Sequence, residues 1–194
     1  MANVDRPNGF KVVGSLSGVQ NGMVQPCISD ADNLFIGDIV IKNAAGTAVN
    51  DGAYMAVDRS TNGATDIPVG VVVGFQPNPT ALGNLYHAAS TSYFVYVNTD
   101  PNVIIEGQGD GAGTVVVAAD VGLNIDYITT AGSTTSGASN MEVDSSSGAT
   151  TAATPLKIIG LVDTPDNAVG VANQKFKLIF NMHAFKSDAG TAGL

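Results

Sequence analysis

The chain has 194 residues, of which 44% are hydrophobic and only 13% are charged, and its formal net charge is −9. A chain of this length and apolar content can bury a substantial core, which excludes a disordered acidic tail. The eight Lys and Arg residues form no basic run. The counterion release that drives nucleic-acid binding is therefore missing, and an acidic surface repels anionic membranes, so we expect no nucleic-acid and no membrane partner.

The N-terminal segment, residues 1–33, is rich in Gly, Asn, Pro and Ser, and its apolar residues are thinly spread. This composition predicts an extended arm with one or two short strands. Because such an arm has no core of its own, we expect a neighbouring molecule to order it. The candidate contact residues are Phe10, Val12, Leu16 and Met23.

The first half of the chain continues with segments that have the composition of β-strands. Residues 67–75, IPVGVVVGF, form a continuous apolar run with four valines, whose length favours a buried strand over a helix. The Asn-Asp-Gly sequence at 50–52 is a turn signal. The other strands predicted here are 34–40, 53–57 and 93–98.

In the second half, residues 129–154 are rich in Ser, Thr, Gly and Ala and predict a surface excursion, and the small residues of 187–194 predict a flexible tail. One helical turn is predicted within 118–126. The spacing of strands and turns predicts an all-β fold for residues 34–186, a small antiparallel β-barrel or a jelly-roll-like sandwich with an extended N-terminal arm. The strands predicted here are 103–106, 114–118, 156–162 and 175–180.

The sequence offers few side chains for catalysis. His87 and His183 are far apart, and neither has a Cys, Asp or Glu at the spacing of metal ligands. Cys27 is the only cysteine, so no intrachain disulfide can form, which fits assembly in the reducing cytoplasm of a cell. Cys27 has no nearby base, and no Gly-x-Ser-x-Gly motif is present. We therefore expect neither an enzyme nor a cofactor.

Two loop sequences resemble ligand-binding motifs, but their sequence context does not support ligand binding. The glycine-rich loop at 107–113 superficially resembles a phosphate cradle, but strand sequence follows it where a nucleotide site needs a helix, so a hairpin turn is favoured. Asp30, Asp32 and Asp38 begin like a calcium loop that lacks the required glycine and final glutamate. No metal site is predicted, although an irregular cation site at these acids stays open.

Several stretches spread over most of the chain point to a known family. They are MANVDRPNGFK at the N-terminus, YFVYVN followed by TDPNVIIEGQGDG, and then AADVGLNIDY, STTSGASNMEVDSSS, PLKIIGLVDTPDNAVG and KLIFNMHAF. Together they resemble proteins encoded beside the major capsid protein in tailed bacteriophages, especially marine podophages and cyanophages. The chain departs from the family pattern at Gly107, which replaces an apolar residue, and this leaves the local strand pairing open.

The resemblance implies a capsid cement or decoration protein, a small β-barrel or jelly roll that binds the outside of the expanded shell, often as a trimer. We expect a structural virion protein that bridges capsomers, with the major capsid protein and other copies of itself as partners and a trimer favoured. The net charge of −9 favours the outer capsid surface, because packaged DNA fills the inside with phosphate. The alternative is a tail-fibre or host-recognition β domain, and an enzyme such as a depolymerase comes third.

Overall fold

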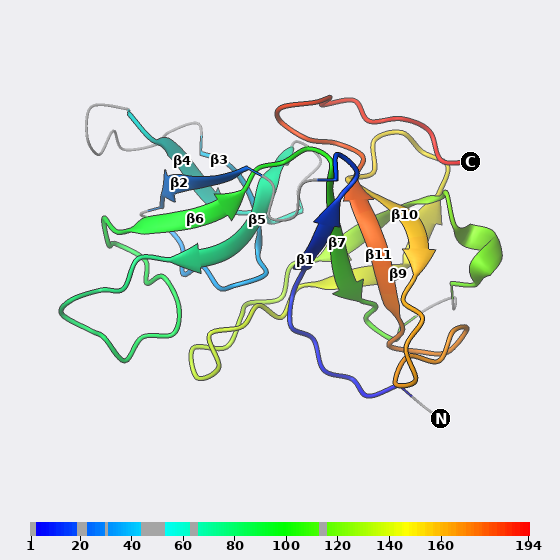
Figure 1. Ribbon diagram of the computed structural model, residues 1–194, viewed down its shortest axis with the longest axis horizontal. Helices are drawn as coiled ribbons and strands as arrows, with labels where there is room; N and C mark the ends of the chain where they lie inside the picture. The colour runs from blue at the N-terminus through cyan, green and yellow to red at the C-terminus, as the bar shows by residue number, and fades with distance from the viewer. Residues whose placement is uncertain (1–2, 19–22, 30, 44–52, 63–65, 113–115) are drawn as a thin grey trace.

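The computed structural model describes residues 3–18, 23–29, 31–43, 53–62, 66–112 and 116–194. These residues form an all-β fold, as predicted, in two lobes that lie side by side in Figure 1. The predicted helical turn is present as the short 3-10 helix η2 (Ala118–Asp120). The strands are β1 (Lys11–Ser15), β2 (Val24–Ile28), β3 (Ile39–Lys42), β4 (Met55–Arg59), β5 (Pro68–Phe75), β6 (Phe94–Asn98), β7 (Val103–Gln108), β8 (Asn124–Ile128), β9 (Glu142–Ala149), β10 (Leu156–Leu161) and β11 (Lys175–Phe180).

The barrel lobe is a closed barrel with the strand order β2-β4-β3-β5-β6. β2 runs parallel to β4, and the other pairs are antiparallel. The apolar run predicted at 67–75 forms β5, the longest of the five strands. Apolar residues from all five strands and from the segment before β3 fill the interior: Cys27, Leu34, Val40, Val57, Val69, Val72, Val95 and Val97.

The sheet lobe is an antiparallel sheet with the order β1-β7-β11-β10-β8-β9. Its far edge, β9, returns towards the end of β7, because Val143 bridges Gly109 and the Asp110 amide donates to the Val143 carbonyl at 3.0 Å. The sheet therefore curls around its own core, and β1 remains at the other edge. This core contains Phe10, Val103, Ile105, Val116, Ile125, Tyr127, Met141, Val143, Leu156, Ile158, Phe176, Leu178 and Phe180.

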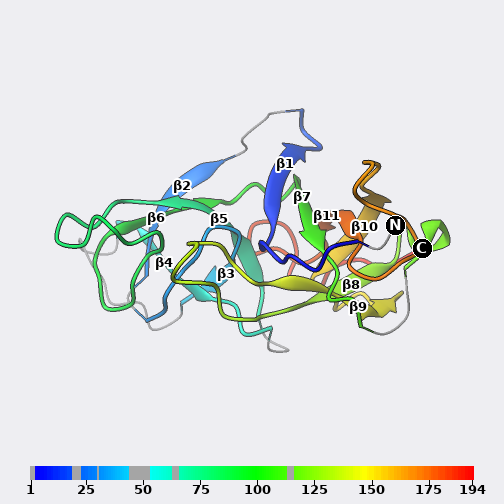
Figure 2. The same cartoon turned by 90° about the horizontal axis from the view of Figure 1, so that it is seen from below.

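The two lobes share apolar packing and hydrogen bonds. Ile39 of β3 and Val71 of β5 belong to the core of the sheet lobe. Residues 129–141 reach from the sheet lobe to the barrel lobe, where Ala138 bridges Ile36 and the backbone N–H of Ile39 donates to the Met141 sulfur at 3.2 Å. Figure 2 shows this yellow-green segment running along the barrel lobe near β3.

The N-terminal segment 1–33 differs from the predicted arm. β1 pairs with β7 and β2 pairs with β6, so its two strands complete different lobes of the same chain. Phe10 is buried in the sheet-lobe core, where its ring meets that of Tyr127 at a centroid distance of 6.0 Å. The one or two short strands predicted here are confirmed as β1 and β2. The expectation that a neighbour orders the segment is wrong, because each strand packs on residues of the same chain far away in the sequence.

Residues 129–154 are also more integrated than a surface excursion. Met141 and Val143 are fully buried, and β9 pairs with β8 at both of its ends, through residues 142–144 and Ala149. The Ser-rich sequence of β9 lacks the apolar alternation of a typical strand. Side-chain hydrogen bonds stabilise this strand instead. An example is the Ser147 hydroxyl, which donates to the Asp144 carbonyl at 2.7 Å.

The C-terminal tail, 187–194, is bound to the body of the molecule rather than free. The Leu194 amide donates to the Gly122 carbonyl at 3.0 Å, and the Asn124 side-chain amide donates to the Thr191 carbonyl at 2.7 Å. These contacts are polar and long-range, so neither hydropathy nor local propensity predicts them. The turn predicted at 50–52 and part of the strand predicted at 114–118 lie outside the described residues.

The sequence left the strand pairing around Gly107 open, and in the structure this pairing is present. Gly107 lies within β7 and is opposite Phe176 of β11. A Cβ atom at this position would lie 2.6 Å from Cε1 of the Phe10 ring and 3.2 Å from Cγ2 of Val143. Glycine therefore makes room for the Phe10 ring, as expected where a strand closely approaches another group.

Candidate interaction site

Both histidines have structural roles. His87 is buried, its backbone pairs with Leu34, and its Nε2 atom lies 3.0 Å from the Tyr93 carbonyl oxygen. His183 is buried, and its Nδ1 atom accepts the backbone N–H of Phe185 at 3.1 Å. Burial lowers the pKa of both imidazoles, that of His183 to about 4. Both rings are therefore neutral at neutral pH and hold turns in place.

The acids near the start of the barrel lobe also bind the backbone. Asp38 is completely buried and accepts the N–H of Phe35 at 3.0 Å, and burial raises its pKa to about 6. Asp32 accepts the N–H of Arg59 at 3.2 Å, whereas Asp30 lies outside the described residues. Across the described part of the chain, no three His, Cys, Asp or Glu side chains gather as a metal site would require.

The glycine-rich loop at 107–113 joins the two ends of the curled sheet. The Gly109 amide donates to the Gln174 carbonyl at 2.9 Å, and Asp110 accepts the amide of Ser145 at 3.2 Å. Its amides therefore bind protein groups, and a carboxylate occupies the place where a phosphate cradle would need positive charge. Residue 113 lies outside the described residues.

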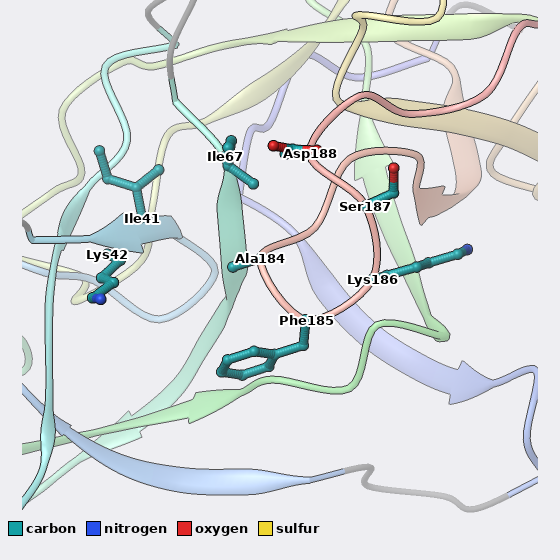
Figure 3. Close-up of a pocket in the computed structure, with 8 residues that line it drawn as sticks. All are labelled: Ile41, Lys42, Ile67, Ala184, Phe185, Lys186, Ser187 and Asp188. Atoms are coloured by element: carbon teal, nitrogen blue, oxygen red, sulfur yellow. The ribbon is translucent and has the colours of Figure 1, made fainter.

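A polar hollow of about 630 Å³ lies between the barrel lobe and the turn at 184–188. Its lining includes Lys42, Lys186 and Asp188, but Figure 3 shows that the two lysines extend in opposite directions, away from a common centre. A binding site for a small charged ligand needs polar groups that converge on it. This hollow is therefore a junction between two surface segments.

A second and more apolar cavity, of about 550 Å³, lies between the two lobes. We call it the interlobe cleft. On the side of the sheet lobe it follows β1 and the residues before it, and on the other side it is walled by the barrel. Among the described residues its lining has one charged side chain, that of Lys11, and comprises Asn8, Phe10, Lys11, Val12, Val24, Ile36, Gly37, Val72, Val73 and Asn98.

The four predicted contact residues lie in two different places in the structure, two in each. Phe10 and Val12 line the interlobe cleft, although Phe10 is only 2% exposed and belongs chiefly to the core. Leu16 and Met23 are 58% and 55% exposed. They flank the connection between β6 and β7, because the Leu16 amide donates to the Asn102 carbonyl and the Met23 carbonyl accepts the Thr99 amide.

Three apolar cleft residues with exposed or partly exposed side chains were not predicted as contacts. Val24 and Ile36 are large apolar side chains with 44% and 46% of their surface exposed, and Val73 is partly buried on the barrel wall. A sequence signal existed for Val73, since three successive valines in β5 cannot all face the barrel interior when side chains alternate. Ile36 gave no such signal, because its exposure follows from the turn at Gly37.

Comparison with known proteins identifies no relative. No protein-family description, no curated protein and no solved structure matches this chain. Among the described residues, no helix has the length and apolar character needed to cross a membrane.

Proposed function

We propose that this chain is a structural, non-enzymatic protein of a phage virion that binds the outer surface of the capsid and stabilises it by bridging neighbouring capsomers. The observation that carries the proposal is the apolar surface around the β1–β2 connection. Leu16, Met23 and Val24 are exposed there, in a protein whose net charge is −9. Clustered exposed apolar residues on an otherwise polar surface are typical of a contact with another protein.

The energy of such a contact comes from apolar burial. Covering one exposed side chain of the size of Leu or Met contributes about 1–3 kcal/mol. A single copy would bind weakly through so few residues, but linking copies through a symmetric oligomer multiplies the effect. This favours a cyclic assembly of the protein, with a trimer as the proposed form.

The charge of the chain supports the outer surface as its location. A net charge of −9 faces repulsion from packaged DNA, which screening over about 8–10 Å removes only in part. The outside of the head has no such layer of phosphate. Binding through apolar residues is also compatible with a chain that has only eight Lys and Arg residues.

Co-sedimentation with expanded, DNA-free shells tests the proposal. The wild-type chain should pellet with the shells, and the double variant Leu16→Asp, Met23→Asp should lose most of its binding because two carboxylates would be desolvated at the contact. Leu82→Asp is the matched control, since Leu82 is 76% exposed in the loop between β5 and β6. Equal binding of the double variant and the control would contradict the proposed contact, and failure of the wild type to bind would contradict the function. Copy number per virion separates a shell protein from the alternative tail protein.

A further inference from the structure

β1 is the open edge of the sheet lobe. It is the outermost strand of the sheet, and within the described part of the chain only β7 pairs with it. The opposite edge, β9, is partly covered by Gly109 and Asp110. Unpaired backbone groups along an edge strand are a template for another extended segment.

The interlobe cleft lies along this open edge. Its lining includes Asn8 and Phe10 just before β1, Lys11 and Val12 at the start of β1, and apolar side chains of the barrel wall such as Val24 and Val73. A strand added beside β1 would lie about 4.7–4.9 Å from it. One side of such a strand could then hydrogen-bond to β1, while its side chains meet the valines of the barrel.

The register of the sheet specifies the chemistry of an added strand. Lys11 is opposite Glu106 of β7, which is opposite Lys177 of β11, so charges alternate along this row. The next row contains Val12, Ile105 and Leu178 and is apolar. An added strand would extend the first row with an acid beside Lys11 and the second with an apolar residue beside Val12. Opposite charges and apolar pairs are the favourable cross-strand neighbours.

We infer that the interlobe cleft takes one extended segment of the capsid protein as an additional strand beside β1, with an acidic residue opposite Lys11 and an apolar residue opposite Val12. This inference rests on the proposed function and adds a mode of attachment to it. Charge complementarity selects the occupant, because Lys11 is the one charged residue in the described lining of the cleft, in a chain whose net charge is −9.

A second copy of the chain fits this cleft less well than a peptide segment. Edge-to-edge pairing of two β1 strands would bring the sheet of one copy onto the barrel wall of the other. It would also place two chains of net charge −9 in close contact.

The test uses the full chain, labelled with nitrogen-15, and two end-capped hexapeptides as probes. One is Thr-Val-Glu-Val-Thr-Val, and the other replaces its Glu with Lys. Amide exchange in residues 11–15 should slow when the Glu peptide is added, and this peptide should bind about two- to fivefold more tightly than the Lys peptide. In Lys11→Glu the preference should reverse, whereas Lys186→Glu, an exposed control in the polar hollow, should leave it unchanged.

Three results would overturn the inference. The first is protection of β9 rather than β1 by the peptides. The second is a peptide preference that Lys11→Glu does not alter. The third is protection of residues 11–15 that depends on protein concentration without peptide, which would assign the edge to a second copy.

Shell binding separates this inference from the proposed function. Lys11→Glu combined with Ile36→Asp, a cleft residue outside the proposed contact around the β1–β2 connection, should weaken co-sedimentation with expanded shells at least tenfold if the cleft holds a capsid segment. Undiminished binding of the double variant to shells would contradict the inference but not the proposed function. If the wild-type chain binds the Glu peptide but does not bind shells, the result would support the proposed chemistry of the cleft and contradict the proposed function.

Discussion

At the scale of single residues, buried polar groups do more to shape this protein than to provide chemistry. Asp38 has no solvent exposure, and its carboxylate accepts the N–H of Phe35 in the turn that leads into β3. Ser139, from the segment that crosses between the lobes, lowers the pKa of this carboxyl group, by less than burial raises it. The acid thus lies where both lobes meet, and its ionisation should affect the stability of the whole chain.

The substitution Asp38→Asn should change the dependence of stability on pH. Burial raises the pKa of Asp38 to about 6, with Arg59 lowering it and Asp32 raising it by smaller amounts. Because the folded pKa exceeds the unfolded value, the native state holds the proton more tightly between about pH 4 and 6. The wild-type chain should therefore lose about 1–3 kcal/mol relative to the Asn variant as pH rises through this range.

Urea unfolding of both proteins at several pH values measures this difference. Comparison with the variant is needed because His183 has the opposite effect in an overlapping range. Burial lowers its pKa to about 4, so its contribution is lost as pH falls below its unfolded value. Parallel pH profiles of the two proteins would contradict the assignment of Asp38.

Gly107 and Phe10 should behave as a coupled pair. Gly107→Ala places a Cβ atom 2.6 Å from the Phe10 ring, so it should destabilise the fold by about 1–3 kcal/mol. Phe10→Leu, which removes the ring but keeps an apolar side chain, should reduce the cost of Gly107→Ala. Thermal unfolding of the two single variants and the double variant gives the coupling energy. Additive losses would show that the ring does not require this glycine.

At the scale of elements, strands with dense apolar or β-branched sequence could be predicted closely. The prediction 175–180 coincides with β11, and 67–75 differs from β5 by one residue. The prediction 34–40 failed over its first part, since Gly37 adopts a φ of +96° and β3 begins only at Ile39. A positive φ interrupts a strand in a way that hydropathy does not reveal.

The elements that lack such a pattern could not be predicted, and neither could the cleft that they build. β1 and β2 are short and have thinly spread apolar residues, and their stability comes from pairing with β7 and β6, far along the chain. The interlobe cleft depends on the same long-range pairing. Sequence reasoning therefore proposed Phe10, Val12, Leu16 and Met23 as contact candidates but did not propose Val24, Ile36 and Val73, which line the cleft.

Removal of residues 1–32 should abolish cooperative folding. Without β1 and β2 the barrel loses a strand that closes it, and the sheet lobe loses both its edge strand and Phe10. Truncation of a large core aromatic alone costs about 3–5 kcal/mol, a sizeable part of the stability of a typical domain. Circular dichroism during heating provides the measurement. A truncated chain with an unchanged, cooperative transition would mean that the segment is an arm after all.

At the scale of the whole molecule, the protein consists of two β lobes joined through shared packing. It exposes apolar residues at the β1–β2 connection, and the chain as a whole carries a negative net charge. Ile39 and Val71 reach from the barrel into the core of the sheet lobe, so the lobes support each other. A rigid body with an apolar contact region is suited to hold neighbouring subunits at a fixed separation. We propose that those subunits are capsomers on the outside of a phage head.

A cryo-electron microscopy map of the intact virion tests this claim most directly. Our account predicts density for this two-lobed chain on the outer capsid surface, in contact with more than one capsomer, with Leu16 and Met23 at the contact and an extended capsid segment beside β1. Density for the chain inside the head, or only in the tail, would contradict it.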